Sequence, residues 1–130
     1  MSLYAYLTRL EDTLRSRHDI VLENLRLTLT SIGAIFEADV RFHDGSRLVI
    51  TEEVEQVGRR DIRRIMYKYQ YQHPDGTSIF RYDNAPHHPH LSTFPSHKHI
   101  AGSVVEAEPP DLSDVLREID GIIYPVPEDG

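Results

Sequence analysis

The chain has 130 residues and carries 14 Lys and Arg against 21 Asp and Glu, which gives a formal net charge of −7 at pH 7. This length predicts one domain over residues 1–130, with a flexible acidic tail at 121–130. The chain has no cysteine, which excludes disulfides, thiolate metal sites and cysteine nucleophiles. No apolar run reaches the ~20 residues of a membrane span, and no secretory signal is present, so we expect a cytoplasmic protein with no membrane partner.

The chain begins with the pattern of an amphipathic helix. Ser2 is of the residue type that caps helices. The apolar residues that follow it recur at intervals of three and four, as one stripe of a helix that ends near Ser16. They are Leu3, Leu7, Leu10 and Leu14.

The segments up to residue 50 alternate between apolar and polar residues, which is typical of strands buried on one face. Strands are predicted at 25–29, 36–42 and 46–50. The sequence His43–Gly45 has the composition of a three-residue hairpin loop. This loop places Val40 opposite Leu48 and aligns the apolar residues on one face of the sheet.

A second hairpin is predicted farther along the chain. Its parts are a strand at 62–72, a turn at His73–Gly76 and a strand at 77–83. The turn predicts three opposed pairs, namely Tyr67 with Asp83, Tyr69 with Arg81 and Tyr71 with Ile79. The three tyrosines share one face, which fits either a core surface or a platform for stacking.

The chain from 84 to 93 contains Pro86 and Pro89 and is expected to be irregular. A short helix is predicted to begin at Asp111 or Ser113 and to run through Asp120. The predicted fold is therefore α+β, with an N-terminal helix, an antiparallel β-meander of about five strands, a His-rich loop and a C-terminal helix.

Charge is distributed unevenly along the chain. Residues 59–99 contain seven basic residues and three acids, a net charge of +4, whereas the rest of the chain carries −11. Such asymmetry is typical of a binding face, although a solvated turn explains the arginines between 59 and 64 equally well.

Histidines are concentrated after the second hairpin. Five lie within thirteen residues: His87, His88, His90, His97 and His99. Because imidazole titrates near neutrality, such a group can both take up and release a proton. Arg81 and Lys98 are nearby and could stabilise a pentacovalent phosphate. Together these residues could cleave RNA without a metal, by attack of its 2′-hydroxyl.

Two other interpretations of the histidines remain open. His97 and His99 would lie on one face of a strand and, with His87 or His88 and Asp83, could form a zinc or iron site. The loop could also be a protein-binding surface without catalysis, because the acidic remainder of the chain suits a basic partner. Motifs for nucleotide phosphate binding and for serine hydrolases are absent from the sequence.

One string of residues resembles a known family. Phe80–His88 reads FRYDNAPHH, His97–His99 reads HKH, and Tyr67–Tyr71 before them reads YKYQY. This pattern resembles the TumE-type toxin family of bacterial and archaeal toxin–antitoxin modules, over roughly residues 2–120. The resemblance implies a small cytoplasmic toxin, a helix-turn-helix antitoxin as partner, and ribonuclease activity on RNA.

The first hypothesis is therefore an endoribonuclease toxin that needs no cofactor, with a divalent metal such as zinc as the alternative and a homo-oligomer as a further expectation. In it the histidines supply acid and base, Arg81 stabilises the transition state, and Tyr82 and Asp83 position these groups. The candidate catalytic residues are His87, His88, His97, His99, Arg81, Tyr82 and Asp83. The candidate RNA-binding residues are Lys68, Arg63, Arg64, Tyr69 and Lys98.

Overall fold

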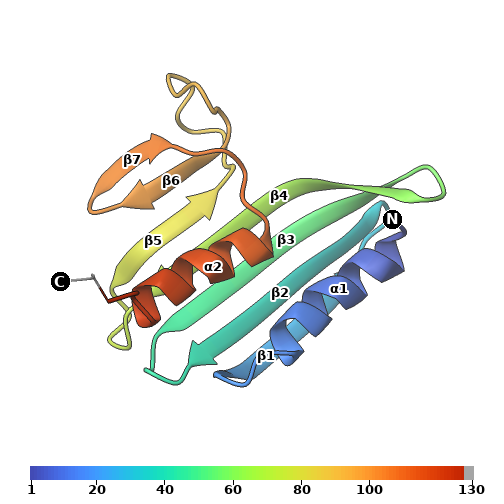
Figure 1. Cartoon of the computed structure of the whole chain (residues 1–130). Coiled ribbons are helices and arrows are strands. Elements are labelled where there is room, and N and C mark those ends of the chain that lie inside the picture. The colour runs from blue at the N-terminus through green and yellow to red at the C-terminus, as the bar shows by residue number, and fades with distance from the viewer. Residues whose placement is uncertain (128–130) are drawn as a thin grey trace.

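A computed structural model describes residues 1–127 of the chain. The elements in chain order are α1 (Leu3–Arg15), β1 (Ile20–Leu29), β2 (Gly33–Phe42), β3 (Arg47–Val57), β4 (Asp61–Gln72), β5 (Ser78–Asp83), β6 (His97–Ile100), β7 (Ser103–Glu106) and α2 (Leu112–Ile123). The strands form one antiparallel sheet in the order β1 to β7. Both helices pack on the same face of this sheet, so that the opposite face is open in the part described (Figure 1). The α+β prediction is confirmed, with seven strands rather than about five.

The two helices begin where their capping residues predict. Ser2 accepts a hydrogen bond from the backbone N–H of Ala5, and Asp111 and Asp114 form a capping box at the start of α2. The apolar stripe of α1 contributes Leu10 and Leu14 to the core, which the sheet completes. The predicted end of the second helix at Asp120 is wrong, because α2 continues to Ile123.

The expected flexible tail at 121–130 therefore starts with residues that are helical, and its last three positions, 128–130, lie outside the described residues. Within residues 1–127, neither helix has the length and apolar character needed to cross a membrane.

The register of the first predicted hairpin is confirmed. Val40 pairs with Leu48 and Ala38 with Ile50, and all four side chains are buried on the face that the helices cover. The alternation of burial along β2 and β3 follows from this pairing, since successive side chains of a strand point to opposite faces.

The register of the second hairpin is one residue away from the prediction. Next to the turn Gln72 pairs with Ser78, which the predicted pairing of Tyr71 with Ile79 implies, but Tyr71 itself pairs with Phe80. Ile79 is thus an extra residue, a β-bulge that the turn sequence did not indicate. Every pair beyond the bulge is displaced as a result.

This displacement decides which side chains share a face. Tyr69 pairs with Tyr82 and lies on the helix-covered face, whereas Arg81 pairs with Gln70 on the open face. The tyrosine ladder is a core surface, since Tyr69 is fully buried. Asp83 pairs with Lys68 and shares the open face with Arg81.

The hairpin of β6 and β7 was missing from the predicted strands. It turns at Ala101 and Gly102, whose φ angles of 51° and 76° are those of a tight turn that suits a hairpin. The strands have only four residues each, so their alternation was too short to stand out.

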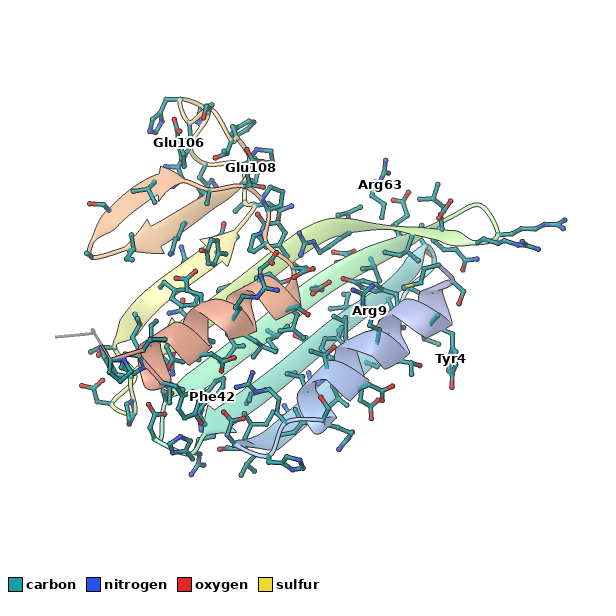
Figure 2. All side chains as sticks on the ribbon, in the orientation of Figure 1. Tyr4, Arg9, Phe42, Arg63, Glu106 and Glu108 are labelled. Atoms are coloured by element: carbon teal, nitrogen blue, oxygen red, sulfur yellow. The ribbon has the colours of Figure 1, made fainter. Side chains whose placement is uncertain are left out.

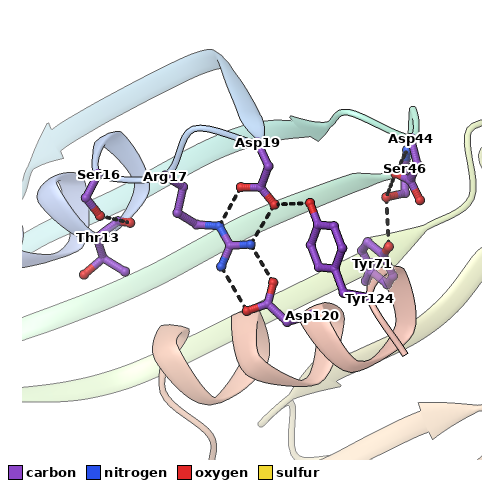
Figure 3. A network of polar contacts seen from close by, with 9 residues as sticks. All are labelled: Thr13, Ser16, Arg17, Asp19, Asp44, Ser46, Tyr71, Asp120 and Tyr124. Carbon is purple, nitrogen blue, oxygen red and sulfur yellow. Dashed lines mark hydrogen bonds and ion pairs between the residues drawn. The ribbon is translucent and has the colours of Figure 1, made fainter. Parts of the chain in front are cut away.

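An arginine fastens the start of the sheet to the C-terminal helix (Figure 3). Arg17 contacts Asp19 at 2.9 Å and Asp120 of α2 at 2.6 Å. The hydroxyl of Tyr124 also donates to Asp19, over 3.0 Å. These contacts hold α2 across the face that opposes the open one.

Candidate active site on the open face of the sheet

Two neighbouring strands place four polar side chains side by side on the open face. In the pairing of β5 with β6, Arg81 lies opposite His99 and Asp83 lies opposite His97. Directly opposed residues in an antiparallel pair have side chains on the same face. The loop between these strands returns over them and adds His88, whose ring centroid is 4.8 Å from that of His97.

These residues line a pocket of about 550 Å³, which is within the size range of small-molecule sites. Its polar wall holds Lys68, Arg81, Asp83, His87, His88, His97 and His99. The apolar residues of its lining include Ile65, Met66, Ala85 and Pro86. Four of the five clustered histidines therefore line one pocket with Arg81, and His90 does not.

Asp83 and His97 form the buried base of the pocket. Nε2 of His97 lies 2.9 Å from Oδ1 of Asp83, and Nδ1 lies 2.9 Å from the carbonyl oxygen of Pro95. Both partners are acceptors, so the ring satisfies both contacts only when both nitrogens carry protons. Because the His97 side chain is only 2% exposed, it can hold Asp83 in place but cannot reach a substrate.

Arg81 connects the carboxylate to the second histidine of β6. Its Nε donates to Oδ2 of Asp83 over 2.9 Å, and its Nη2 lies 2.8 Å from Nε2 of His99. A guanidinium only donates, so Nε2 of His99 accepts and the ring proton resides on Nδ1. Burial, followed by the charge of Arg81, lowers the pKa of His99 below its ordinary value, which favours the same neutral form.

His88 is partly exposed and comes from the loop rather than from a strand. Desolvation and the neighbouring charge of His97 lower its pKa, so the ring is held neutral with a free lone pair. His87 lines the pocket but is exposed and donates no side-chain hydrogen bond in the described structure. His90 is exposed and does not line the pocket.

Two predicted site residues lie on the opposite face. Tyr82 and Lys98 follow one position after Arg81 and His97, so strand alternation directs them toward α2. The Tyr82 hydroxyl donates to Glu118 over 2.5 Å and the Lys98 ammonium lies 2.7 Å from the same carboxylate. The prediction that Tyr82 lies with the histidines is wrong, because alternation along β5 turns its side chain away from Arg81 and Asp83 and toward Glu118.

Two more of the predicted RNA-binding residues, Arg64 and Tyr69, lie on the helix-covered face of the sheet. Arg64 donates to the Tyr69 hydroxyl over 2.7 Å and to the carbonyl of Pro110 over 2.6 Å. Tyr69 in turn donates to the buried carboxylate of Glu52 over 2.6 Å. These groups are engaged with one another beneath the helices rather than offered to a ligand.

The remaining predicted cations are on the surface. Lys68 is exposed at the rim of the pocket, opposite Asp83. Arg63 is exposed outside the pocket and forms an ion pair with Glu55 at 2.9 Å. Figure 2 shows Glu106 and Glu108 beside the His-rich loop, so acidic side chains flank this region.

The sequence interpretation did not identify Asn84 as a site residue. Its side chain accepts from the backbone N–H of Tyr67 and donates to the carbonyl of Ile65. It thereby ties the start of the His-rich loop to β4 and forms part of the pocket wall. Its position directly after Asp83 was the available signal, since Asn commonly bonds to backbone at strand ends.

The central histidines also have the arrangement of a metal site. One nitrogen from each of His88, His97 and His99 lies within 4.8 Å of the others. The hydrogen bond from Nδ1 of His97 to Pro95 is the type of second contact that orients metal-bound imidazoles. Chemically, the pocket can therefore transfer protons beside a guanidinium or hold a divalent cation.

Comparison with models of known protein families gave a match. The family model described as "Toxin TumE" matches residues 9–123, which include the whole pocket. Neither the search of curated proteins nor that of solved structures found a match.

Proposed function

The chain belongs to the TumE toxin family and is the toxin of a toxin–antitoxin module, and from this membership we propose that it acts as a metal-independent endoribonuclease in the cytoplasm. The observation that carries the proposal is the pocket in which His88, His99 and Arg81 meet on an open sheet face. Acid–base groups beside a guanidinium suit phosphodiester cleavage. The antitoxin that family membership implies is proposed to be a helix-turn-helix protein.

The proposed reaction uses the 2′-hydroxyl of the RNA itself. His88, the neutral histidine with a free lone pair, takes the proton of the hydroxyl, whose oxygen then bonds to phosphorus, and His99 is the second histidine of the reaction. The bond from phosphorus to the 5′ oxygen breaks, and the second histidine gives that oxygen a proton. The products are a 2′,3′-cyclic phosphate and a 5′-hydroxyl. The anionic substrate favours protonation of one of the two rings on binding, because an opposite charge stabilises the charged form.

The other pocket residues have supporting roles in this proposal. Arg81 is held by Asp83 and directs its guanidinium to the pocket, where it stabilises charge on the phosphoryl oxygens. His97 acts through Asp83 as a positioning residue, since it is buried. The apolar wall at Met66 and Pro86 offers a surface for an unstacked base, which favours single-stranded RNA as substrate.

The test is cleavage of a single-stranded RNA by the chain made by cell-free synthesis. We expect products with cyclic phosphate ends, and no cleavage where a 2′-deoxy nucleotide replaces the reacting one. His88→Gln and His99→Gln should each lower the rate by about 10²–10⁴, the usual contribution of one acid–base group. His90→Gln is the matched control, since His90 belongs to the same loop but not to the pocket. Cleavage at the normal rate in the double variant would contradict the proposal.

A second candidate is a metal-dependent nuclease, which the spacing of the His88, His97 and His99 nitrogens favours. A cation held there would act as a Lewis acid or activate water, with Nε2 of His97 bound to it in place of Asp83 and the carbonyl of Pro95 orienting the ring through Nδ1. The two candidates differ in their response to a chelator. Loss of cleavage with EDTA and its return with added Zn²⁺ or Mn²⁺ would establish this second mechanism in place of the first.

A further inference from the structure

The two edges of the sheet differ in a way that points to a partner. β1 is an edge strand of ten residues, whereas β7 at the other edge has four. Proteins commonly keep edge strands short or protect them with charges and bulges, because unpaired backbone groups template another strand. β7 is protected in this way because it is short. β1 lies beside α1 at the end of the sheet and is not short (Figure 1).

The second half of β1 also exposes large apolar side chains. Leu27 is 50% exposed and Leu29 is 73% exposed. They pair with Phe36 and Ala34 of β2, both buried, so they belong to the core face of the sheet. α1 does not cover them. The apolar surface of the core therefore continues past the last strand and ends uncovered.

The first half of β1 is protected and limits where a partner can pair. The register shifts between Leu22 and Asn24, which makes Glu23 an extra residue in a bulge. Glu23 also forms ion pairs with Arg41 and Arg47 of the neighbouring strands. The segment that remains regular and free for pairing is 25–29.

This segment is complementary to itself when two copies run antiparallel. With the two-fold axis at Leu27, that residue faces Leu27 of the partner subunit, and Leu25 faces Leu29 of the partner subunit. All these leucines lie on the core face, because Leu25 pairs with the buried Ala38 in the same phase. On the other face Arg26 meets Thr28 of the partner subunit, so no like charges oppose each other.

We propose that this surface binds a second copy of the chain, so that two β1 strands pair and their sheets join into one. Such pairing satisfies the edge backbone groups and covers Leu27 and Leu29. An antiparallel pair of edge strands around an axis perpendicular to the sheet keeps both open faces on the same side. The two histidine pockets then lie on one continuous surface, far from the interface at β1, since three strands separate β1 from β5.

The test is the mass of the full chain in solution, measured by light scattering over a dilution series in the micromolar range. We expect twice the 15.0 kDa of the monomer, with dissociation on dilution. Leu27→Lys should weaken the dimer at least about tenfold, because it places a charge opposite its own copy. Val105→Lys on β7 is the matched control, a similarly exposed apolar residue on the other edge, and should leave the mass unchanged.

Circular dichroism of each variant establishes that the fold is intact, and hydrogen exchange of the wild-type chain gives a second readout. The amides of 25–29 should gain protection as the concentration rises. A wild-type monomer across the series would overturn the proposal, as would a dimer that Leu27→Lys leaves intact. A monomeric chain whose Leu27→Lys variant loses antitoxin binding would overturn it too, and would assign the edge to the antitoxin. None of these results depends on ribonuclease activity.

Discussion

Asp83 is the residue on which the proposed site depends most. It is buried and bound to the Arg81 guanidinium, the His97 ring and the backbone N–H of Ala85. Asp83→Asn removes the carboxylate charge and leaves the Arg81 guanidinium without its partner. We expect it to lower the free energy of unfolding by about 3 kcal/mol, as for other buried ion pairs that lose one member. Urea unfolding measures this change.

The control for this substitution is Asp75→Asn in the turn between β4 and β5. Asp75 also accepts hydrogen bonds, from Thr77, but it is exposed and lacks a cation as partner. Its replacement should therefore cost much less stability than the replacement of Asp83. Equal costs for the two variants would show that the buried contacts of Asp83 contribute nothing to stability.

His99 is predicted to be neutral at pH 7 with its proton on Nδ1. Arg81 donates to Nε2, and burial together with the Arg81 charge lowers the pKa, against the opposing effect of Asp83 and with small contributions from His97 and His88. Nitrogen NMR shifts of labelled histidine distinguish the two tautomers. A spectrum with the proton on Nε2, or a charged ring at neutral pH, would contradict the geometry.

The lowered pKa of His99 also predicts how stability depends on pH. Below the ordinary pKa of 6.5 the unfolded chain binds a proton that the folded chain resists. Stability should therefore rise with pH through the window between the lowered pKa and 6.5, and fall as pH drops through it. His99→Gln should flatten this part of the curve in chemical unfolding experiments. An unchanged slope in the variant would exclude His99 as its source.

At the scale of elements, alternate residues of β5 and β6 face either the pocket or the helix α2 on the other side of the sheet. Arg81 faces the pocket while Tyr82, the next residue, faces α2, where Glu118 binds it together with Lys98. Glu118→Ala should lower stability by about 1 kcal/mol and leave RNA cleavage close to normal. Arg81→Lys should lower RNA cleavage, because a lysine cannot keep the two directed contacts of the guanidinium. Cleavage lost in Glu118→Ala with the fold intact would contradict this division.

The sequence could predict the cluster of histidines, but not the face of the sheet on which Arg81 and Tyr82 each lie. Hairpin 43–45 was predictable because its loop length and apolar alternation agree. In the next hairpin the bulge at Ile79 has no turn residue to mark it, and one extra residue exchanges the faces of Arg81 and Tyr82. The approach of His88 to β6 depends on a loop with no periodicity, so no pattern could predict it.

At the scale of the whole molecule, a net charge of −7 restricts how RNA can be bound. The cations at the pocket are Arg81 and Lys68, with one histidine that becomes charged on binding. About three phosphate contacts to single-stranded RNA predict a slope of about −2 for the logarithm of affinity against that of salt concentration. A toxin that binds through an extended basic surface would have a much steeper slope.

One lysine variant and one arginine variant test whether the phosphate contacts lie at the pocket. Lys68→Ala should reduce the slope by about 0.7, the contribution of one phosphate contact to a single strand. Arg63→Ala should not change it, because Arg63 is paired with Glu55 outside the pocket. Fluorescence anisotropy with an uncleavable 2′-deoxy-substituted strand at several salt concentrations measures both. If Arg63→Ala changed the salt dependence of affinity and Lys68→Ala did not, the RNA would bind at the far end of β4 rather than at the pocket.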